Sequence, residues 1–147
     1  MDELLIWVPD NVLGHLRKVD AAIATHLRLQ TIEDWYLDGG VLILGYEMFR
    51  NIIMNNKKLG QDTAPLSTEE HAKVKQQLTE GPNIIIADEA HKMKNSSASI
   101  TKATSQFKSK ARIALTGSPL ANNVTEYHTM IEWVAPNYLG MPILQSH

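Results

Sequence analysis

The sequence feature that most constrains the fold is a short apolar run that ends in acidic residues. Gly81-Pro82 breaks the preceding segment, and Ile84–Ala87 follows without polar residues at alternate positions. Such a run predicts a strand covered on both faces, as in parallel sheets with helices above and below. Ligands of these sheets bind beyond the carboxyl ends of the strands. Asp88, Glu89 and His91 are therefore expected at a ligand-binding edge of the sheet.

The two adjacent carboxylates suit the hydrolysis of a nucleoside triphosphate. Asp88 can hold Mg²⁺ directly or through its waters, because this ion keeps much of its hydration and takes few protein oxygens. Glu89 points differently and is free to orient or deprotonate an attacking water, as in the Walker B arrangement. The alternative is a strand that ends in a solvated acidic turn. The unit Asp-Glu-Ala-His arises by chance in roughly one chain of this length per thousand, which favours the hydrolytic interpretation.

Composition narrows the class of protein. A chain of 147 residues fits one domain with a real core, and its 44% hydrophobic and 20% charged residues are ordinary for a soluble globular protein. No apolar run is long enough for a membrane span, and the acidic start does not fit a signal peptide. The absence of cysteine excludes disulfides and thiolate metal sites. A net charge of −2 confines any nucleic-acid contact to local patches.

Further apolar runs predict more strands, each separated from the next by helical sequence. Crossovers of more than about a dozen residues favour parallel pairing and right-handed βαβ units. The sequence therefore predicts an α/β fold of three layers, in which a parallel sheet carries helices on both faces. The strands are expected at residues 4–8, 41–44, 84–87 and 112–116.

Helical periodicity and turn residues place the helices. Gly39-Gly40 is expected to end the first helix, because a left-handed residue commonly follows a helix C-terminus. Ser67 and Glu70 form a predicted capping box, while Asn55–Pro65 and Lys92–Asn95 are expected to be loops. The helices are expected at about 19–37, 46–54, 68–78 and 97–107, with a last one that ends near 134. Their predicted inward residues are Ile23, Leu27, Ile32, Trp35, Ile100, Ala103, Phe107, Val124, Tyr127, Ile131 and Val134.

Four ordered blocks between residues 31 and 140 resemble one family, the SWI/SNF-type helicase-like ATPases. The sequence around the Gly-Gly pair is most similar to that of the ATRX and androgen-receptor-interacting (ARIP) branch of that family. The blocks that resemble motifs Ib, II and III are Gly39-Gly40 with Gly45–Arg50, Asp88–His91 with Lys94-Asn95, and Leu115–Leu120 with Asn122-Asn123. The fourth is Glu126–His128 with Pro136–Gly140.

This resemblance implies a RecA-like lobe of the P-loop NTPase type, with residues 1–140 forming part of the first lobe and 141–147 a divergent tail. By similarity, Asp88 would coordinate Mg²⁺ and Glu89 would act on the hydrolytic water of bound ATP. His91 would link this nucleotide site to the loop that contains Thr116, Gly117 and Ser118. Simple strand-end and N-cap chemistry is the alternative for the two hydroxyl residues of that loop.

The same resemblance implies contacts with double-stranded DNA. Tyr46 and Arg50, which follow Gly45 into a helix, could meet the phosphate backbone without reading sequence. A core position for Tyr46 and a solvated one for Arg50 are equally consistent with the pattern. By similarity, Asn122 and Asn123 are also assigned to DNA. A basic run that contains Lys108, Lys110 and Arg112 either adds phosphate contact or forms a solvated turn.

Two parts of the family pattern do not occur in these 147 residues. There is no glycine-rich loop that ends in Gly-Lys-Thr or Gly-Lys-Ser, and no second lobe with an arginine finger. Ala121 also replaces a glutamine that is usual in the family. We therefore expect an incomplete lobe of a nuclear DNA translocase that acts with chromatin and nucleosome proteins and is inactive alone. The alternatives are a non-catalytic DNA- or protein-binding module and a marginally stable chain without function.

Overall fold

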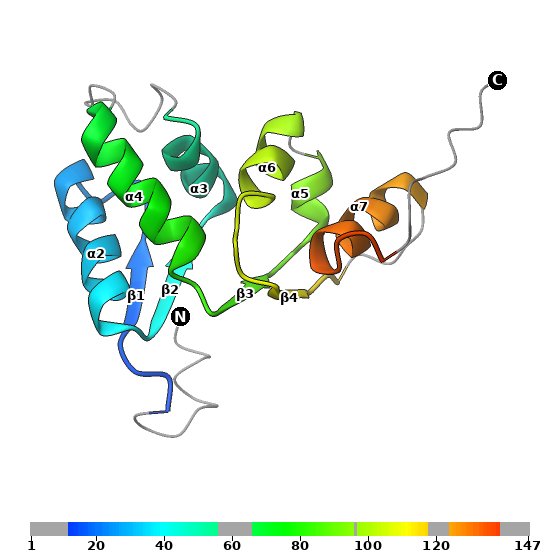
Figure 1. Cartoon of the computed structure of the whole chain (residues 1–147), viewed down its shortest axis with the longest axis horizontal. Coiled ribbons are helices and arrows are strands. Elements are labelled where there is room, and N and C mark those ends of the chain that lie inside the picture. The colour runs from blue at the N-terminus through cyan, green and yellow to red at the C-terminus, as the bar shows by residue number, and fades with distance from the viewer. Residues whose placement is uncertain (1–11, 56–65, 96, 118–123, 139–147) are drawn as a thin grey trace. The chain divides into compact units, whose positions relative to one another are not determined.

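The computed structural model describes residues 12–55, 66–95, 97–117 and 124–138 (Figure 1). The chain divides into two compact units, Met1–Gly81 and Pro82–His147, and each is described by itself. The expected strand at residues 4–8, almost all of the expected loop at 55–65 and the tail at 141–147 lie outside the described residues.

The first unit is a parallel strand pair with three helices. Strand β1 (Leu16–Val19) pairs in parallel with β2 (Val41–Leu44), with the first residue of each strand as partners and the last residue of each as partners. Helix α2 (Thr25–Asp38) packs against both strands and against α4 (Thr68–Glu80). Helix α3 (Tyr46–Ile53) also packs against α4 (Figure 1).

The second unit repeats the parallel arrangement. Strand β3 (Ile84–Ala87) pairs with β4 (Ala111–Ala114) in parallel. Helix α5 (His91–Asn95) packs against both α6 (Ser97–Thr104) and α7 (Val124–Val134), and α7 packs against β4. The prediction of an α/β fold with parallel strands is confirmed. Within the described residues the strands form two separate two-stranded sheets.

The prediction that β3 is covered on both faces is wrong for this structure. Ile84 and Ile86 are 53% and 59% exposed, whereas Ala87 on the opposite face is buried. Arg112 of β4 shares the face of Ala87 and contacts Trp133 of α7. One face of this strand pair therefore carries a helix, and the other presents isoleucines to solvent.

Strand β1 was not expected, because residue 19 was assigned to the start of a helix. Leu16 and Val19 are its only apolar residues, and the two polar residues between them break the apolar–polar alternation that predicts a strand. The backbone pairing with β2 stabilises the extended conformation, beginning with the N–H of Val41, which donates to the carbonyl of His15 at 2.9 Å. The first helix consequently begins at Thr25.

The inward face of α2 differs from the predicted one by a single residue. Ile32 and Trp35 are buried as expected, but Leu27 is 45% exposed. Arg28 lies inward instead, 5% exposed, and its guanidinium donates to the carbonyl oxygen of Ala21 at 2.7 Å. A buried arginine at this position carries no apolar signal, so the periodicity assigned the core to its neighbour.

The second unit departs from the predicted boundaries at three places. Residues 92–95 lie in α5 and do not form a loop, α6 ends at Thr104, and β4 begins and ends earlier than expected. Ile100 and Ala103 are buried as predicted, whereas Phe107 is half-buried beyond the helix. In α7, Trp133 is the buried anchor and Tyr127 is exposed. The indole N–H of Trp133 donates to the carbonyl of Thr104 at 3.2 Å.

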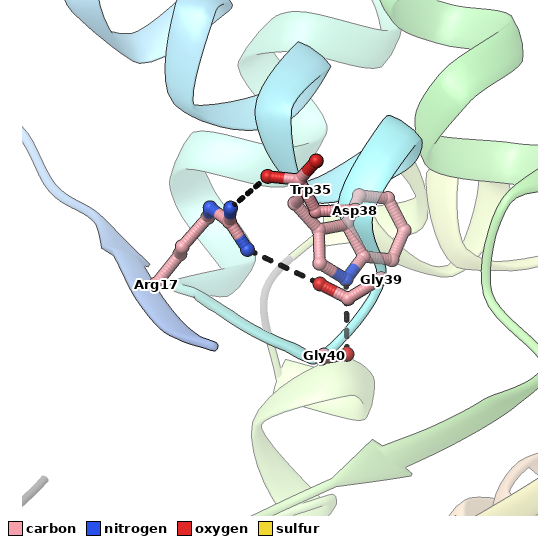
Figure 2. Close-up of polar contacts among 5 residues, drawn as sticks. All are labelled: Arg17, Trp35, Asp38, Gly39 and Gly40. Atoms are coloured by element: carbon pink, nitrogen blue, oxygen red, sulfur yellow. Dashed lines mark hydrogen bonds and ion pairs between the residues drawn. The ribbon is translucent and has the colours of Figure 1, made fainter. Parts of the chain in front are cut away.

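The end of α2 is held by the turn at Gly39-Gly40 (Figure 2). Gly39 and Gly40 have φ of 77° and 90°, which confirms the predicted left-handed termination. The guanidinium of Arg17 donates to the Asp38 carboxylate at 2.6 Å and to the Gly39 carbonyl at 3.1 Å (Figure 2). The indole N–H of Trp35 donates to the Gly40 carbonyl at 3.3 Å. The turn therefore joins α2 to both strands of the first unit.

The predicted capping box begins α4. The hydroxyl of Ser67 accepts from the N–H of Glu70 at 3.2 Å, and the carboxylate of Glu70 accepts from the N–H of Ser67 at 3.0 Å. The hydroxyl of Ser67 also donates to the same carboxylate. The hydrogen bond from the Ser67 hydroxyl has the largest effect on the pKa of Glu70 and holds it below its ordinary value. The hydrogen bond from the Ser67 backbone amide lowers this pKa further.

We expect Ser67→Ala to lower the free energy of unfolding by about 1 kcal/mol, because it leaves the first turn of α4 without its cap. The lowered pKa of Glu70 means that its contribution is present above the ordinary carboxyl pKa and is lost as pH falls through the folded value. Urea unfolding at neutral and acidic pH tests both points. The penalty of Ser67→Ala should shrink in acid, and a penalty that is equal at both pH values would contradict the contribution of the Glu70 carboxylate to the cap.

Candidate nucleotide site

The acidic residues lie in a tight turn at the end of β3. The Asp88 carboxylate accepts from the N–H of Glu89 at 2.8 Å, and the Glu89 carbonyl accepts from the N–H of Lys92 at 2.8 Å. Glu89 has a φ of 50°, a left-handed conformation that costs a non-glycine residue about 1–2 kcal/mol. Such strain persists only where the surrounding structure enforces it, and it is found often at functional sites.

The end of β4 lies directly beside this turn. The N–H of Leu115 donates to the carbonyl of Ala87 at 2.9 Å, and the N–H of Ala90 donates to the carbonyl of Leu115 at 2.8 Å. These two hydrogen bonds extend the pairing beyond the last residues of the strands. The acidic turn and Thr116 therefore meet at the same edge of the parallel pair.

His91 joins the two strand ends through one ring nitrogen. Its Nδ1 lies 3.1 Å from Oε2 of Glu89 and 3.3 Å from Oγ1 of Thr116. The structure thus brings together Glu89, His91 and Thr116, which the sequence assigned to one site. Asp88 is exposed just after the end of β3, and Gly117 is exposed just after the end of β4. Ser118 lies outside the described residues.

The donors of this edge fit Mg²⁺ better than a metal that needs a protein cage. The described ranges contain no cluster of three histidine, aspartate or glutamate side chains that could hold a metal ion. Mg²⁺ is usually held by one or two carboxylates together with water and substrate phosphates. Asp88 supplies such a carboxylate at an exposed strand end.

The candidate DNA residues of α3 are partly engaged within their own helix. Arg50 pairs with the carboxylate of Glu47, and its guanidinium donates to the side-chain oxygen of Asn51 at 2.9 Å. Tyr46 is half-buried at the first residue of the helix, directly after Gly45. Neither side chain is fully solvated. Asn122 and Asn123 lie outside the described residues.

Arg112 is a structural residue and not part of an exposed basic patch. Lys108 and Lys110 are exposed, but the Arg112 guanidinium donates to three carbonyls, those of Phe107, Ser109 and Trp133, at 2.6, 2.9 and 2.9 Å. The same group lies 5.4 Å from the centroid of the Trp133 ring. Burial lowers the pKa of the Arg112 guanidinium. Arg112 therefore ties β4 and its preceding loop to α7.

We expect Arg112→Lys to lower the free energy of unfolding by about 2 kcal/mol, because an ammonium group cannot serve three carbonyls in a fixed fork. Thermal or urea unfolding measures the change. Lys110→Arg is the matched control, since it exchanges the same two side chains at an exposed position and should change stability by less than about 0.5 kcal/mol. Equal effects of the two substitutions would contradict the structural role.

The family model described as the SNF2-related domain matches residues 1–144 of the chain. The chain belongs to the SNF2-related domain family. This confirms the resemblance drawn from the motifs.

Similar proteins come from animals and plants. The chain is 42% identical over 114 residues to the transcriptional regulator ATRX homolog of Drosophila melanogaster, a match that covers 77% of the chain and 8% of that protein. It is 36% identical over 134 residues to the protein CHROMATIN REMODELING 20 of Arabidopsis thaliana, over 91% of the chain and 9% of that protein. It is 35% identical over 133 residues to the helicase ARIP4 of Xenopus tropicalis, over 79% of the chain and 10% of that protein. The chain spans a tenth or less of each.

Reasoning from side chains missed the two residues that join the strand ends through their backbone. Ala90 and Leu115 carry no reactive group, so only the parallel register could have indicated them. Trp133 and Arg112 were also missed as a pair, since they are 21 positions apart in the sequence. None of the helices in the described ranges is long and apolar enough to cross a membrane.

Proposed function

We propose that this SNF2-related domain is part of the RecA-like first ATPase lobe of a DNA translocase. The observation that carries the proposal is the junction of two strand ends, one acidic and one bearing a hydroxyl. His91 contacts both Glu89 and Thr116, and the Ala90 amide bonds the Leu115 carbonyl. A change at one strand end is thereby passed to the other.

The residues divide the work of hydrolysis between them. Asp88 would hold Mg²⁺, which supplies charge neutralisation for the phosphates of ATP when bound. The Glu89 carboxylate, half-exposed beside Asp88, would orient the attacking water or take up its proton. His91 would relay the state of this site to Thr116 and Gly117, with Ser118 assigned to the same loop.

The names of the relatives support an inference about the binding partners of the whole protein. They include a transcriptional regulator, a chromatin-remodelling protein and a helicase. We therefore infer double-stranded DNA and nucleosome proteins as partners, and the nucleus as the location. Tyr46, Arg50, Asn122 and Asn123 are the proposed DNA contacts of this domain. Contacts of this kind position a protein on DNA without reading its sequence.

A second candidate function is a non-catalytic DNA- or protein-binding module. The 147 residues by themselves contain no loop that ends in Gly-Lys-Thr or Gly-Lys-Ser. Such a module would bind duplex DNA with an affinity that falls as salt rises, and nucleotide would not change that affinity. Fluorescence anisotropy with and without ATP distinguishes the two functions.

The hydrolytic proposal is tested by transplanting this chain into a complete relative. In Xenopus tropicalis helicase ARIP4, the matched region is replaced by the corresponding residues of this chain. We expect the chimera to hydrolyse ATP, and we expect Glu89→Gln in the chimera to lower the rate by at least about 100-fold. Glu69→Gln, at an exposed position on the first turn of α4, is the matched control.

The chimera must be folded for either result to count. Its thermal melt and its binding to duplex DNA, measured before and after each substitution, provide that check. If the folded chimera hydrolyses ATP equally well with Glu89 and with glutamine, the assigned role of Glu89 is wrong. If a folded chimera does not hydrolyse ATP at all, the non-catalytic function is the better description.

A further inference from the structure

One ring nitrogen of His91 faces two side chains with different hydrogen-bonding ability. Nδ1 lies 3.1 Å from the Glu89 carboxylate and 3.3 Å from the Thr116 hydroxyl. A carboxylate can only accept, whereas a hydroxyl can donate or accept. Contact with Glu89 therefore requires a proton on Nδ1. Donation from Thr116 requires that the same nitrogen be bare.

The two contacts are unequal in strength. The contact to Glu89 is the shorter one, and its acceptor is an ionised carboxylate. Hydrogen bonds to an ionised acceptor are roughly twice as strong as those between neutral groups. A proton on Nδ1 therefore satisfies the stronger of the two contacts, and the Thr116 oxygen beside it can then share that proton only as an acceptor.

The backbone leaves Glu89 little freedom except in its side chain. Its N–H donates to Asp88 and its carbonyl accepts from Lys92. The next residue, Ala90, is fully buried and bonded to Leu115 through its N–H. With the main chain fixed on both sides, the contact to His91 determines where the carboxylate points.

We propose that His91 is a positioning residue that holds the Glu89 carboxylate in a resting orientation through the proton on Nδ1. Glu89 is released when solvent removes that proton and protonates Nε2, so that the Thr116 hydroxyl can donate to the bare Nδ1. No net proton is gained or lost in this exchange. The side chains of His91 and Glu89 are partly exposed, at 27% and 47%, so water reaches them. Only the purpose of the release, the activation of water, rests on the proposed function.

The position of the proton is measured by two-bond ¹H–¹⁵N correlation spectra of the imidazole rings in the full ¹⁵N-labelled chain. The spectra are recorded without nucleotide at about pH 8, where an unperturbed imidazole is neutral. His71 is an internal reference, because its Nε2 lies 3.1 Å from the carbonyl of Ile53, which can only accept. Its proton should stay on Nε2 in every variant, which also reports that the first unit is folded.

We expect Nδ1 of His91 to be protonated in the wild-type chain, whether or not Nε2 is protonated as well. Glu89→Ala removes the acceptor and should move most of the population to the tautomer with the proton on Nε2 alone. Thr116→Val removes the competing hydroxyl and should leave Nδ1 protonated. The second variant keeps the test valid if the first fails to fold.

The positioning role is contradicted if wild-type His91 carries its proton on Nε2 alone, or if folded Glu89→Ala keeps the wild-type tautomer. It is also contradicted if Thr116→Val moves the proton away from Nδ1. These results do not depend on ATP hydrolysis. If Nδ1 is protonated and the ARIP4 chimera is unaffected by Glu89→Gln, the proposed function is refuted. The positioning of Glu89 by His91 is still supported by that result. If Nδ1 is not protonated and Glu89→Gln slows the chimera, only the positioning of Glu89 by His91 is refuted.

Discussion

ATP hydrolysis by these 147 residues alone is expected to stay at background. The sequence contains no glycine-rich loop to surround the β- and γ-phosphates, and no second lobe to supply an arginine finger. Such a finger alone is worth about 10³–10⁵ in rate in related phosphoryl-transfer enzymes. Phosphate release with Mg²⁺ and duplex DNA, compared with that of the ARIP4 chimera carrying the same residues, should differ by at least about 10³-fold.

Comparing the chain alone with the ARIP4 chimera distinguishes an active site that lacks its phosphate loop and arginine finger from a cluster that cannot take part in hydrolysis. Loss of the phosphate loop weakens binding of the ground state, whereas loss of the finger raises the barrier of the chemical step. Both deficits leave the Glu89, His91 and Thr116 cluster intact. Turnover above background that disappears in Glu89→Gln would therefore show that the cluster suffices for hydrolysis, contrary to this prediction.

Gly40→Ala is expected to lower the free energy of unfolding by about 3 kcal/mol. A Cβ at this position would lie 2.3 Å from the carbonyl oxygen of His15 and 2.8 Å from its nitrogen. Both atoms are backbone, so neither can rotate away. The same His15 carbonyl accepts from the N–H of Val41 as the strands begin, so relief of the clash separates β1 from β2. The left-handed φ of 90° adds to the penalty.

Two neighbouring glycines separate the clash from the backbone conformation. Gly39 has a φ of 77° but an added Cβ would meet nothing within 4 Å, so Gly39→Ala should cost only about 1–2 kcal/mol. Gly45 has a φ of −70° and equally open surroundings. Gly45→Ala should change stability by less than about 0.5 kcal/mol, because lower entropy of the unfolded chain offsets a slightly poorer cap. Urea unfolding of the three variants should rank them in this order.

Equal destabilisation by Gly39→Ala and Gly40→Ala would show that φ alone sets the cost. The close approach of His15 would then have no energetic consequence. The Gly-Gly pair was predicted only as the end of a helix. In the structure its second glycine also lets β1 approach β2, which is why the two positions are expected to respond differently.

The candidate site was more predictable than the core around it. The apolar run before Asp88 and the run before Thr116 each predicted a strand, and parallel pairing places their ends at one edge. The contact of His91 with Thr116 was anticipated from family resemblance, and its contact with Glu89 was not. Nothing in the order of residues 88–91 indicates that the carboxylate turns back toward the ring.

Prediction failed where long-range partners override local pattern. Arg28 takes an inward position that periodicity gave to Leu27, because its guanidinium donates to the carbonyl of Ala21 and to the sulfur of Met48. Arg112 was assigned to a charged run, yet the carbonyls around it and the Trp133 ring draw it inward. Each of these two choices involves one partner about twenty residues away, Met48 for Arg28 and Trp133 for Arg112, which a window of local sequence does not contain.

The sequence by itself determined the family, the parallel α/β character and the kinds of side chain at the strand ends. These properties are encoded locally, since apolar runs, glycine turns and a capping box act through neighbours in the chain. Only the tertiary structure decided that β1 exists, that Arg28 and not Leu27 lies inward on α2, and that the His91 ring faces Glu89. Those outcomes depend on hydrogen bonds and packing between distant segments, whose geometry exists only once the backbone has folded.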